Sequence, residues 1–66
     1  MKFCLYSGLY PNVKKVKESD NIKELEDLGI KDFSDQQIFI NCNIKPYGTV
    51  RIFSNRLKTW EVVNHK

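Results

Sequence analysis

The residues of this sequence most able to do chemistry are two cysteines, Cys4 and Cys42, and one histidine, His65. The cysteines lie 38 positions apart without CxxC spacing, so Cys and His alone cannot complete a tetrahedral zinc site within one chain. A thiol nucleophile needs a base beside it, and the histidine lies next to the C-terminus, where proton-transfer groups are poorly positioned. We therefore predict two free, buried thiols rather than a disulfide, and expect no metal or other cofactor.

Other catalytic signatures are missing from the sequence. Ser7 and Gly8 lack the surroundings of a nucleophile elbow, and the three glycines are too scattered to form a phosphate loop. The acidic residues show no arrangement beyond that of any soluble protein. The sequence therefore predicts that the protein is not an enzyme.

The segment NIKPYGTVRIF, residues 43–53, is the best candidate for a binding surface. Two strands around a KPYG turn, in a three-residue hairpin loop, would send alternate side chains to opposite faces of a sheet. The face turned to the core is predicted to carry Ile40, Cys42, Ile44, Val50 and Ile52. The open face is predicted to carry the protein-binding residues Phe39, Asn41, Asn43, Arg51 and Phe53, with Tyr47 at the exposed turn.

The following strand fixes a second pairing. An odd-numbered loop, residues 55–57, is predicted because it keeps Trp60 and Val62 on the core side. This register places Glu61 opposite Arg51 on the open face, where the carboxylate weakens the positive potential. The open face is therefore expected to suit a protein partner better than a nucleic acid.

The segment SDNIKELEDLGI is typical of a helix. Asn21 is the predicted N-cap, with Glu24 three residues later in a capping box. Gly29 is predicted to end the helix in a left-handed conformation, with Ile30 contacting Leu25 beyond it. The residues that follow are predicted to form a loop.

The remaining segments complete a small sheet. Residues 2–6 are predicted to form a strand, and residues 13–18 a lysine-rich edge strand, while Phe33 is expected to anchor the loop after the helix in the core. The predicted fold class is α+β: a single domain, residues 1–66, with one α-helix on one face of a four- to five-stranded antiparallel sheet that ends in a three-stranded meander.

Charge is unevenly distributed along the chain. Residues 18–35 carry a net charge of −5 and the remainder carries +8, which gives the total of +3. A basic total suggests an alternative function, the binding of single-stranded nucleic acid. The residues predicted to serve it are Lys14, Lys15, Lys17, Arg51, Arg56 and Lys58, and Lys45 would extend this set if the fold brings the loops together. Edge protection by the lysines and an ordinary solvated surface are the competing explanations.

Size and composition limit the remaining options. A chain of 66 residues buries only about 60% of the surface of its unfolded state. No apolar run approaches a membrane span and no export signal is recognisable, so we expect a cytoplasmic protein that binds no membrane. Isoleucine, lysine and asparagine make up 21 of the 66 residues, and their A- and T-rich codons suggest a low-GC bacterium or its bacteriophage.

These observations predict a non-enzymatic regulator that binds a host or cognate protein, for example a bacteriophage or mobile-element inhibitor of a host factor. Binding of single-stranded nucleic acid is the alternative. A homodimer formed through the open face or an edge strand is a third hypothesis, because it would compensate for the small core.

Overall fold

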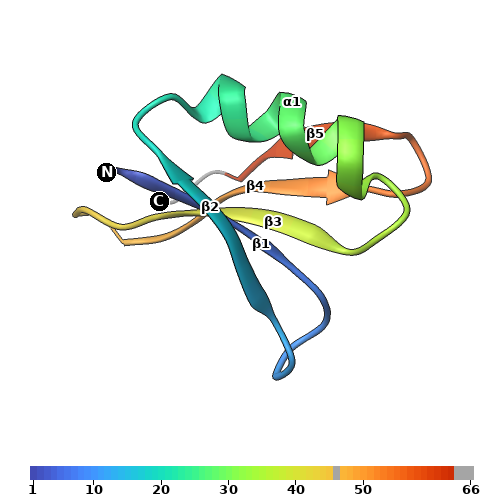
Figure 1. Cartoon of the computed structure of the whole chain (residues 1–66), viewed down its shortest axis with the longest axis horizontal. Coiled ribbons are helices and arrows are strands. Elements are labelled where there is room, and N and C mark those ends of the chain that lie inside the picture. The colour runs from blue at the N-terminus through green and yellow to red at the C-terminus, as the bar shows by residue number, and fades with distance from the viewer. Residues whose placement is uncertain (46, 64–66) are drawn as a thin grey trace.

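A computed structural model describes residues 1–45 and 47–63 and shows one helix against one face of an antiparallel sheet (Figure 1). The described elements are, in chain order, β1 Phe3–Ser7, β2 Lys14–Ser19, α1 Ile22–Phe33, β3 Ile38–Cys42, β4 Gly48–Ser54 and β5 Thr59–Val62. The five strands lie in the order β2-β1-β3-β4-β5, so β3 is the central strand and lies between β1 and β4. The predicted fold class, including the C-terminal meander and the basic edge strand, is confirmed.

The core lies between α1 and the sheet. Its fully buried side chains come from β1, α1, β3 and β4, and they are Leu5, Leu25, Ile38, Ile40 and Phe53. Phe33 packs against this cluster, as predicted. The structure contains free thiols at Cys4, which is buried, and Cys42, which is half-buried.

Helix α1 begins where the sequence predicts. The Asn21 side chain accepts a hydrogen bond from the Lys23 amide at 3.0 Å, which confirms it as the N-cap. The predicted capping box is wrong, because the main-chain amide of Asn21 donates a hydrogen bond to Ser19 Oγ at 3.0 Å rather than to the Glu24 side chain. Glu24 instead pairs with Lys17 of β2 at 2.8 Å.

The predicted end of the helix at Gly29 is also wrong, because α1 continues to Phe33. Gly29 is buried inside the helix, and a Cβ atom placed there would lie 2.7 Å from Trp60 Cζ2 and 2.8 Å from Ile38 Cδ1. The glycine thus allows a close approach of helix to sheet rather than a left-handed turn. Ile30 is consequently an exposed helix residue and not part of a Schellman ending.

The predicted register between β3 and β4 is wrong. Ile40 pairs with Arg51 rather than Ser54, and Phe39 pairs with Ile52. The connection spans residues 43–47 instead of three residues; Pro46, part of the predicted turn, lies outside the described residues. For the pairs of Phe39 and Ile40 the register differs by three residues, an odd number, which exchanges the two faces of β4 from Arg51 onward.

A β-bulge accompanies this register. The pairing shifts between Ile40 and Asn41, so Asn41 pairs with Thr49 and Val50 becomes the extra residue of β4. Val50 packs against the core cluster although it precedes Arg51, which also turns toward the helix. The bulge therefore places two successive side chains of β4 on the helix side.

The connection from β4 to β5 has four residues, 55–58, and not the predicted three. Lys58 closes it with a positive φ of 57° and donates its amide to Ser54 O at 2.7 Å. The prediction that Trp60 faces the core side is confirmed, since it pairs with Phe53 and their rings meet edge to face at 5.3 Å. The predicted core position of Val62 is wrong, because its side chain is 64% exposed.

Candidate functional site: the open face of the sheet

A single row of paired residues crosses all five strands on the face that α1 does not cover. Tyr6 of β1 pairs with Lys15 of β2 and with Phe39 of β3. Phe39 pairs with Ile52 of β4, which pairs with Glu61 of β5. We call these five residues the cross-strand row, which has a cation at one end, three largely apolar side chains in the middle and an anion at the other end.

The middle of the row is an ordered apolar surface. The rings of Tyr6 and Phe39 stack with centroids 5.3 Å apart and an interplanar angle of 15°. The Ile52 side chain is 41% exposed, although it lies in the centre of β4. Beside it is an open pocket of about 240 Å³, lined by Gln37, Phe39, Thr49 and Ile52.

Polar groups next to the apolar surface are arranged for hydrogen bonding. Thr49 Oγ1 donates to Asn41 Oδ1 at 2.8 Å, which orients the Asn41 amide on the open face. The pKa of Tyr6 is raised above its ordinary value of 10.0 because the phenol is partly buried and lies beside the Cys4 thiol. The Tyr6 hydroxyl is thus neutral at physiological pH and able to donate or accept a hydrogen bond.

The two ends of the row differ in their own pairing. Lys15 forms an ion pair with Glu18 on the same strand, and this hydrogen bond raises the pKa of Lys15 and lowers that of Glu18. Glu61 forms no ion pair with any residue in the ranges 1–45 and 47–63. The β5 end of the row therefore carries a negative charge that has no ion-pair partner among the described residues.

The structure brings only part of the predicted protein-binding set to this face. Phe39 and Asn41 lie on it, and Tyr47 is 67% exposed in the β3–β4 connection. Asn43 is exposed just beyond β3, where its main-chain amide donates a hydrogen bond to Lys2 O at 2.7 Å. Phe53 is placed wrongly by the sequence prediction, because it is only 1% exposed and belongs to the core.

Arg51 is also placed wrongly by the sequence prediction. Its Nε lies 2.9 Å from Glu26 Oε2 of α1, on the helix side of the sheet. It therefore pairs with the helix and not with Glu61, which lies on the opposite face beside Ile52. The false position follows from the register, since an odd shift moves the β4 side chains after the bulge to the opposite face.

Sequence reasoning missed Tyr6 and Ile52 as surface residues. A signal for Tyr6 was present, because it alternates with Leu5, which is fully buried, along β1. No comparable signal existed for Ile52, since its place on the open face depends on the bulge in β4.

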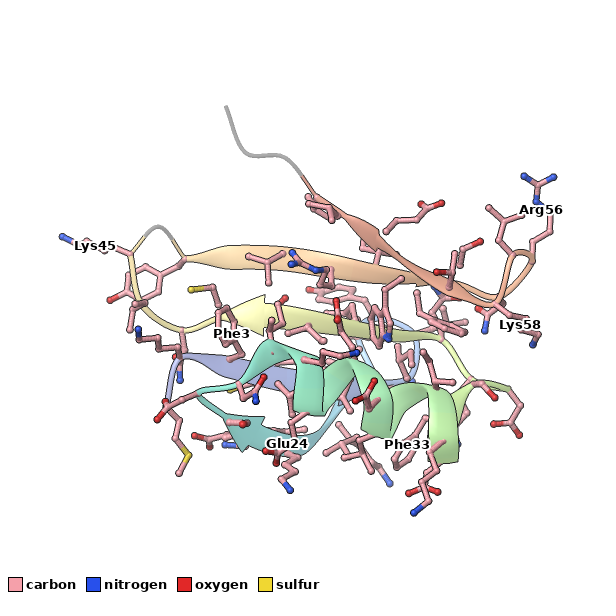
Figure 2. The ribbon with its side chains drawn as sticks, turned by 90° about the horizontal axis from the view of Figure 1, so that it is seen from above. Phe3, Glu24, Phe33, Lys45, Arg56 and Lys58 are labelled. Carbon is pink, nitrogen blue, oxygen red and sulfur yellow. The ribbon has the colours of Figure 1, made fainter. Side chains whose placement is uncertain are left out.

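The basic residues predicted to bind nucleic acid do not form one patch. Lys14, Lys15 and Lys17 lie on the edge strand β2, where Lys15 and Lys17 pair with glutamates. Figure 2 shows Lys45 at one end of the sheet and both Arg56 and Lys58 at the opposite end. The positive charges are therefore dispersed over separate regions of the surface.

The fold and this face define a small α+β domain with one covered and one open sheet surface. Within the described residues, no group of three or more His, Cys, Asp or Glu side chains could hold a metal ion. No helix in the described part of the chain has the length and apolar character needed to cross a membrane. Comparisons with protein-family models, curated proteins and solved structures find no match.

Proposed function

We propose that this chain is a non-enzymatic regulatory protein that binds another protein through the open face of its sheet. The cross-strand row is the observation that supports this proposal. Tyr6, Phe39 and Ile52 form a continuous apolar strip with a pocket beside it, and charged residues lie at both ends. Aromatic anchors surrounded by a polar rim are the usual composition of protein interfaces.

The charge of the face favours a protein over a nucleic acid. Its strand residues include one lysine, Lys15, and two glutamates, Glu18 and Glu61, and the lysine is already paired. A surface for single-stranded nucleic acid needs uncompensated lysine or arginine beside its stacking aromatics. The nearest arginine on β4, Arg51, pairs with Glu26 on the other side of the sheet.

The proposal extends to the kind of regulation. A small domain that acts by occupying a surface of its target needs no catalytic centre, and a 66-residue chain fits that role. The richness in isoleucine, lysine and asparagine agrees with a bacteriophage or mobile-element protein that inhibits a factor of a low-GC bacterial host. We therefore propose such a host protein as the target.

The test compares two isoleucines of similar exposure on opposite sides of the molecule. Ile52 on the open face is 41% exposed and Ile30 on α1 is 46% exposed. The immobilised chain is used to capture a protein from a low-GC bacterial lysate, and the affinity of the purified partner is then measured. Phe39→Ala and Ile52→Ala should each weaken binding by about tenfold or more, whereas Ile30→Ala should leave it unchanged.

Two results would contradict the proposal. One is a partner that binds wild type and the Phe39→Ala and Ile52→Ala variants equally well while all three remain folded. The other is tight binding of labelled single-stranded oligonucleotides that weakens steeply with salt and is lost in Phe39→Ala, which would favour the nucleic-acid alternative.

A further inference from the structure

We propose that the open face also binds a second copy of this chain, and that the two copies pack face to face around a two-fold axis along β3. This inference rests on the proposed function, because it assigns a specific partner to the same docking surface. The order of residues in the cross-strand row supports it. The row reads Lys15, Tyr6, Phe39, Ile52 and Glu61 across the five strands, with Phe39 on the central strand.

A rotation of 180° about an axis along β3 reverses this row and keeps the strand direction. Phe39 of one copy then lies against Phe39 of the second copy, and Tyr6 lies against Ile52. Each Lys15 faces Glu61 of the second copy, so both ends of the combined row carry opposite charges. The interface is self-complementary, as a two-fold dimer requires.

The charges select this axis over the alternative one. A two-fold axis that runs across the strands would place Lys15 against Lys15 and Glu61 against Glu61, which repel each other. The axis along β3 instead gives Glu61 a basic partner that it lacks among the described residues of its own chain. It also keeps the strands of the two sheets aligned, which is a common geometry of packed sheets.

The same rotation accounts for exposed apolar residues outside the row. The β1–β2 hairpin curls away from the helix, toward the open side of the sheet (Figure 1). Leu9 and Tyr10 at its tip are 70% and 89% exposed. Since β1 and β4 both run antiparallel to β3, the tip lies at the same end as the β4–β5 connection, where Leu57 is 57% exposed. In the dimer, the tip of one copy approaches this connection of the other.

The tip has a defined shape that presents these side chains. Gly8 has a φ of 107°, and a Cβ atom there would lie 2.7 Å from Asn12 O. The main-chain amide of Gly8 donates a hydrogen bond to Gln37 O at 2.8 Å, and the main-chain amide of Asn12 donates one to Leu9 O at 2.7 Å. The hydrogen bonds hold Leu9 and Tyr10 outward before any partner binds, which reduces the entropy lost on association.

The size of the face sets the expected strength. Five strands about 4.8 Å apart and about five residues long give a projected area of roughly 400 Å² on each copy. A standard interface buries about 800 Å² per partner, so the dimer should be weak and should form at micromolar to millimolar concentration.

The first experiment measures association of the wild-type chain by sedimentation equilibrium from about 10 µM to about 1 mM. We expect a monomer–dimer equilibrium. Glu61→Lys should weaken dimerisation by about fivefold or more, because it places two cations opposite each other. Lys14→Glu is the control, because it also changes the charge by two units but lies outside the row, and it should change the equilibrium less than Glu61→Lys.

A charge exchange tests the specific pairing. The double variant Lys15→Glu with Glu18→Lys keeps an ion pair within β2 but reverses the end of the row, so it should weaken the dimer. Adding Glu61→Lys to this double variant should restore dimerisation toward the wild-type value. Failure of the triple variant to recover, with all variants folded by circular dichroism, would overturn the proposed axis.

A cross-link tests the position of Phe39 independently of charge. After Cys4→Ala and Cys42→Ala have removed the native thiols, a short bismaleimide that spans about 10 Å, the spacing of packed sheets, should link two Phe39→Cys chains much faster than two Ile30→Cys chains. Equal rates, or a wild-type chain that is monomeric up to about 1 mM, would overturn the dimer.

The outcomes separate this inference from the proposed function. A strictly monomeric chain that loses its captured partner on Phe39→Ala overturns the dimer and leaves the proposed function intact. A dimer that responds to the charge exchange, together with partner binding that ignores Phe39→Ala and Ile52→Ala, supports the dimer and overturns the proposed function.

Discussion

Arg51 Nε lies 2.9 Å from Glu26 Oε2, so an ion pair joins strand β4 to the middle of helix α1. The two side chains are 24% and 22% exposed, so they are less accessible to water than the side chains of an ordinary surface ion pair. The main-chain carbonyl of the same Glu26 accepts a hydrogen bond from Trp60 Nε1 at 2.9 Å. One helical residue therefore links α1 to both β4 and β5, and it holds Arg51 away from the open face.

Removing the charge of Arg51 should destabilise the protein. Arg51→Met keeps most of the apolar stem but leaves the Glu26 carboxylate half-buried without its partner. We expect the free energy of unfolding to fall by about 1–2 kcal/mol in urea titrations. Arg56→Met, in the exposed β4–β5 connection, is the control and should change it by less than about 0.5 kcal/mol. Equal effects of the two substitutions would contradict the role of the pair.

A side chain at Gly29 should disturb the packing of α1 on the sheet. Alanine favours helix formation by about 1 kcal/mol over glycine, but its Cβ atom would lie 2.7 Å from the rigid Trp60 ring. We expect overpacking to dominate, so that Gly29→Ala lowers the unfolding free energy by about 1–2 kcal/mol. Combining Gly29→Ala with Trp60→Phe should cost less than the sum of the two single changes. A stabilised Gly29→Ala variant would show that the ring moves aside without loss.

The two phenylalanines of the meander should respond differently to truncation. Phe53 is 1% exposed within the core cluster, so Phe53→Ala should cost about 3–5 kcal/mol and leave little folded protein. Phe39 is part of an exposed stack with Tyr6, and Phe39→Ala should cost about 1 kcal/mol. Thermal unfolding followed by circular dichroism distinguishes the two. Comparable losses would mean that the faces of the sheet are assigned wrongly.

Glu24 should titrate below its ordinary pKa. Its carboxylate accepts a hydrogen bond from Lys17 at 2.8 Å, and this bond, together with the positive charge, lowers the pKa of Glu24 from 4.5. A depressed pKa in the folded state adds stability above the unfolded pKa, and this contribution is lost as the pH falls through the folded pKa. Carboxyl NMR titration should show the lowered pKa in wild type and its return toward 4.5 in Lys17→Met. Lys14→Met, on the same strand, should leave it unchanged.

The parts of the fold that depend on local interactions were predictable. Asn21 caps α1 because its side chain reaches an amide two residues away, and no distant residue is needed. The alternation of Phe39 and Ile40 correctly assigns the first side chain to the open face and the second to the core. The lysines of residues 13–18 correctly indicate an edge strand, because charged side chains protect an unpaired edge.

Other features could be decided only by contacts between distant segments. From the sequence alone, Gly29 is as compatible with the end of a helix as with a close contact between the helix and the sheet. The position of Trp60, which lies against Gly29, decides for the close contact. Likewise, the KPYG sequence favours a short turn, whereas the paired strands leave five residues between β3 and β4. In both places, packing between distant segments overrides the conformation that the local sequence favours.

The sequence by itself determined the helix start, the strand segments, the direction of the β3 side chains and the α+β class, because each follows from a short-range period or hydrogen bond. Only the tertiary structure decided which face Arg51, Ile52 and Phe53 occupy. Side chains alternate at every residue of a regular strand, so the bulge at Val50 exchanges the predicted faces of the β4 residues that follow it. That exchange buries Phe53, joins Arg51 to the helix and places Ile52 beside Phe39 on the surface where we propose that partners bind.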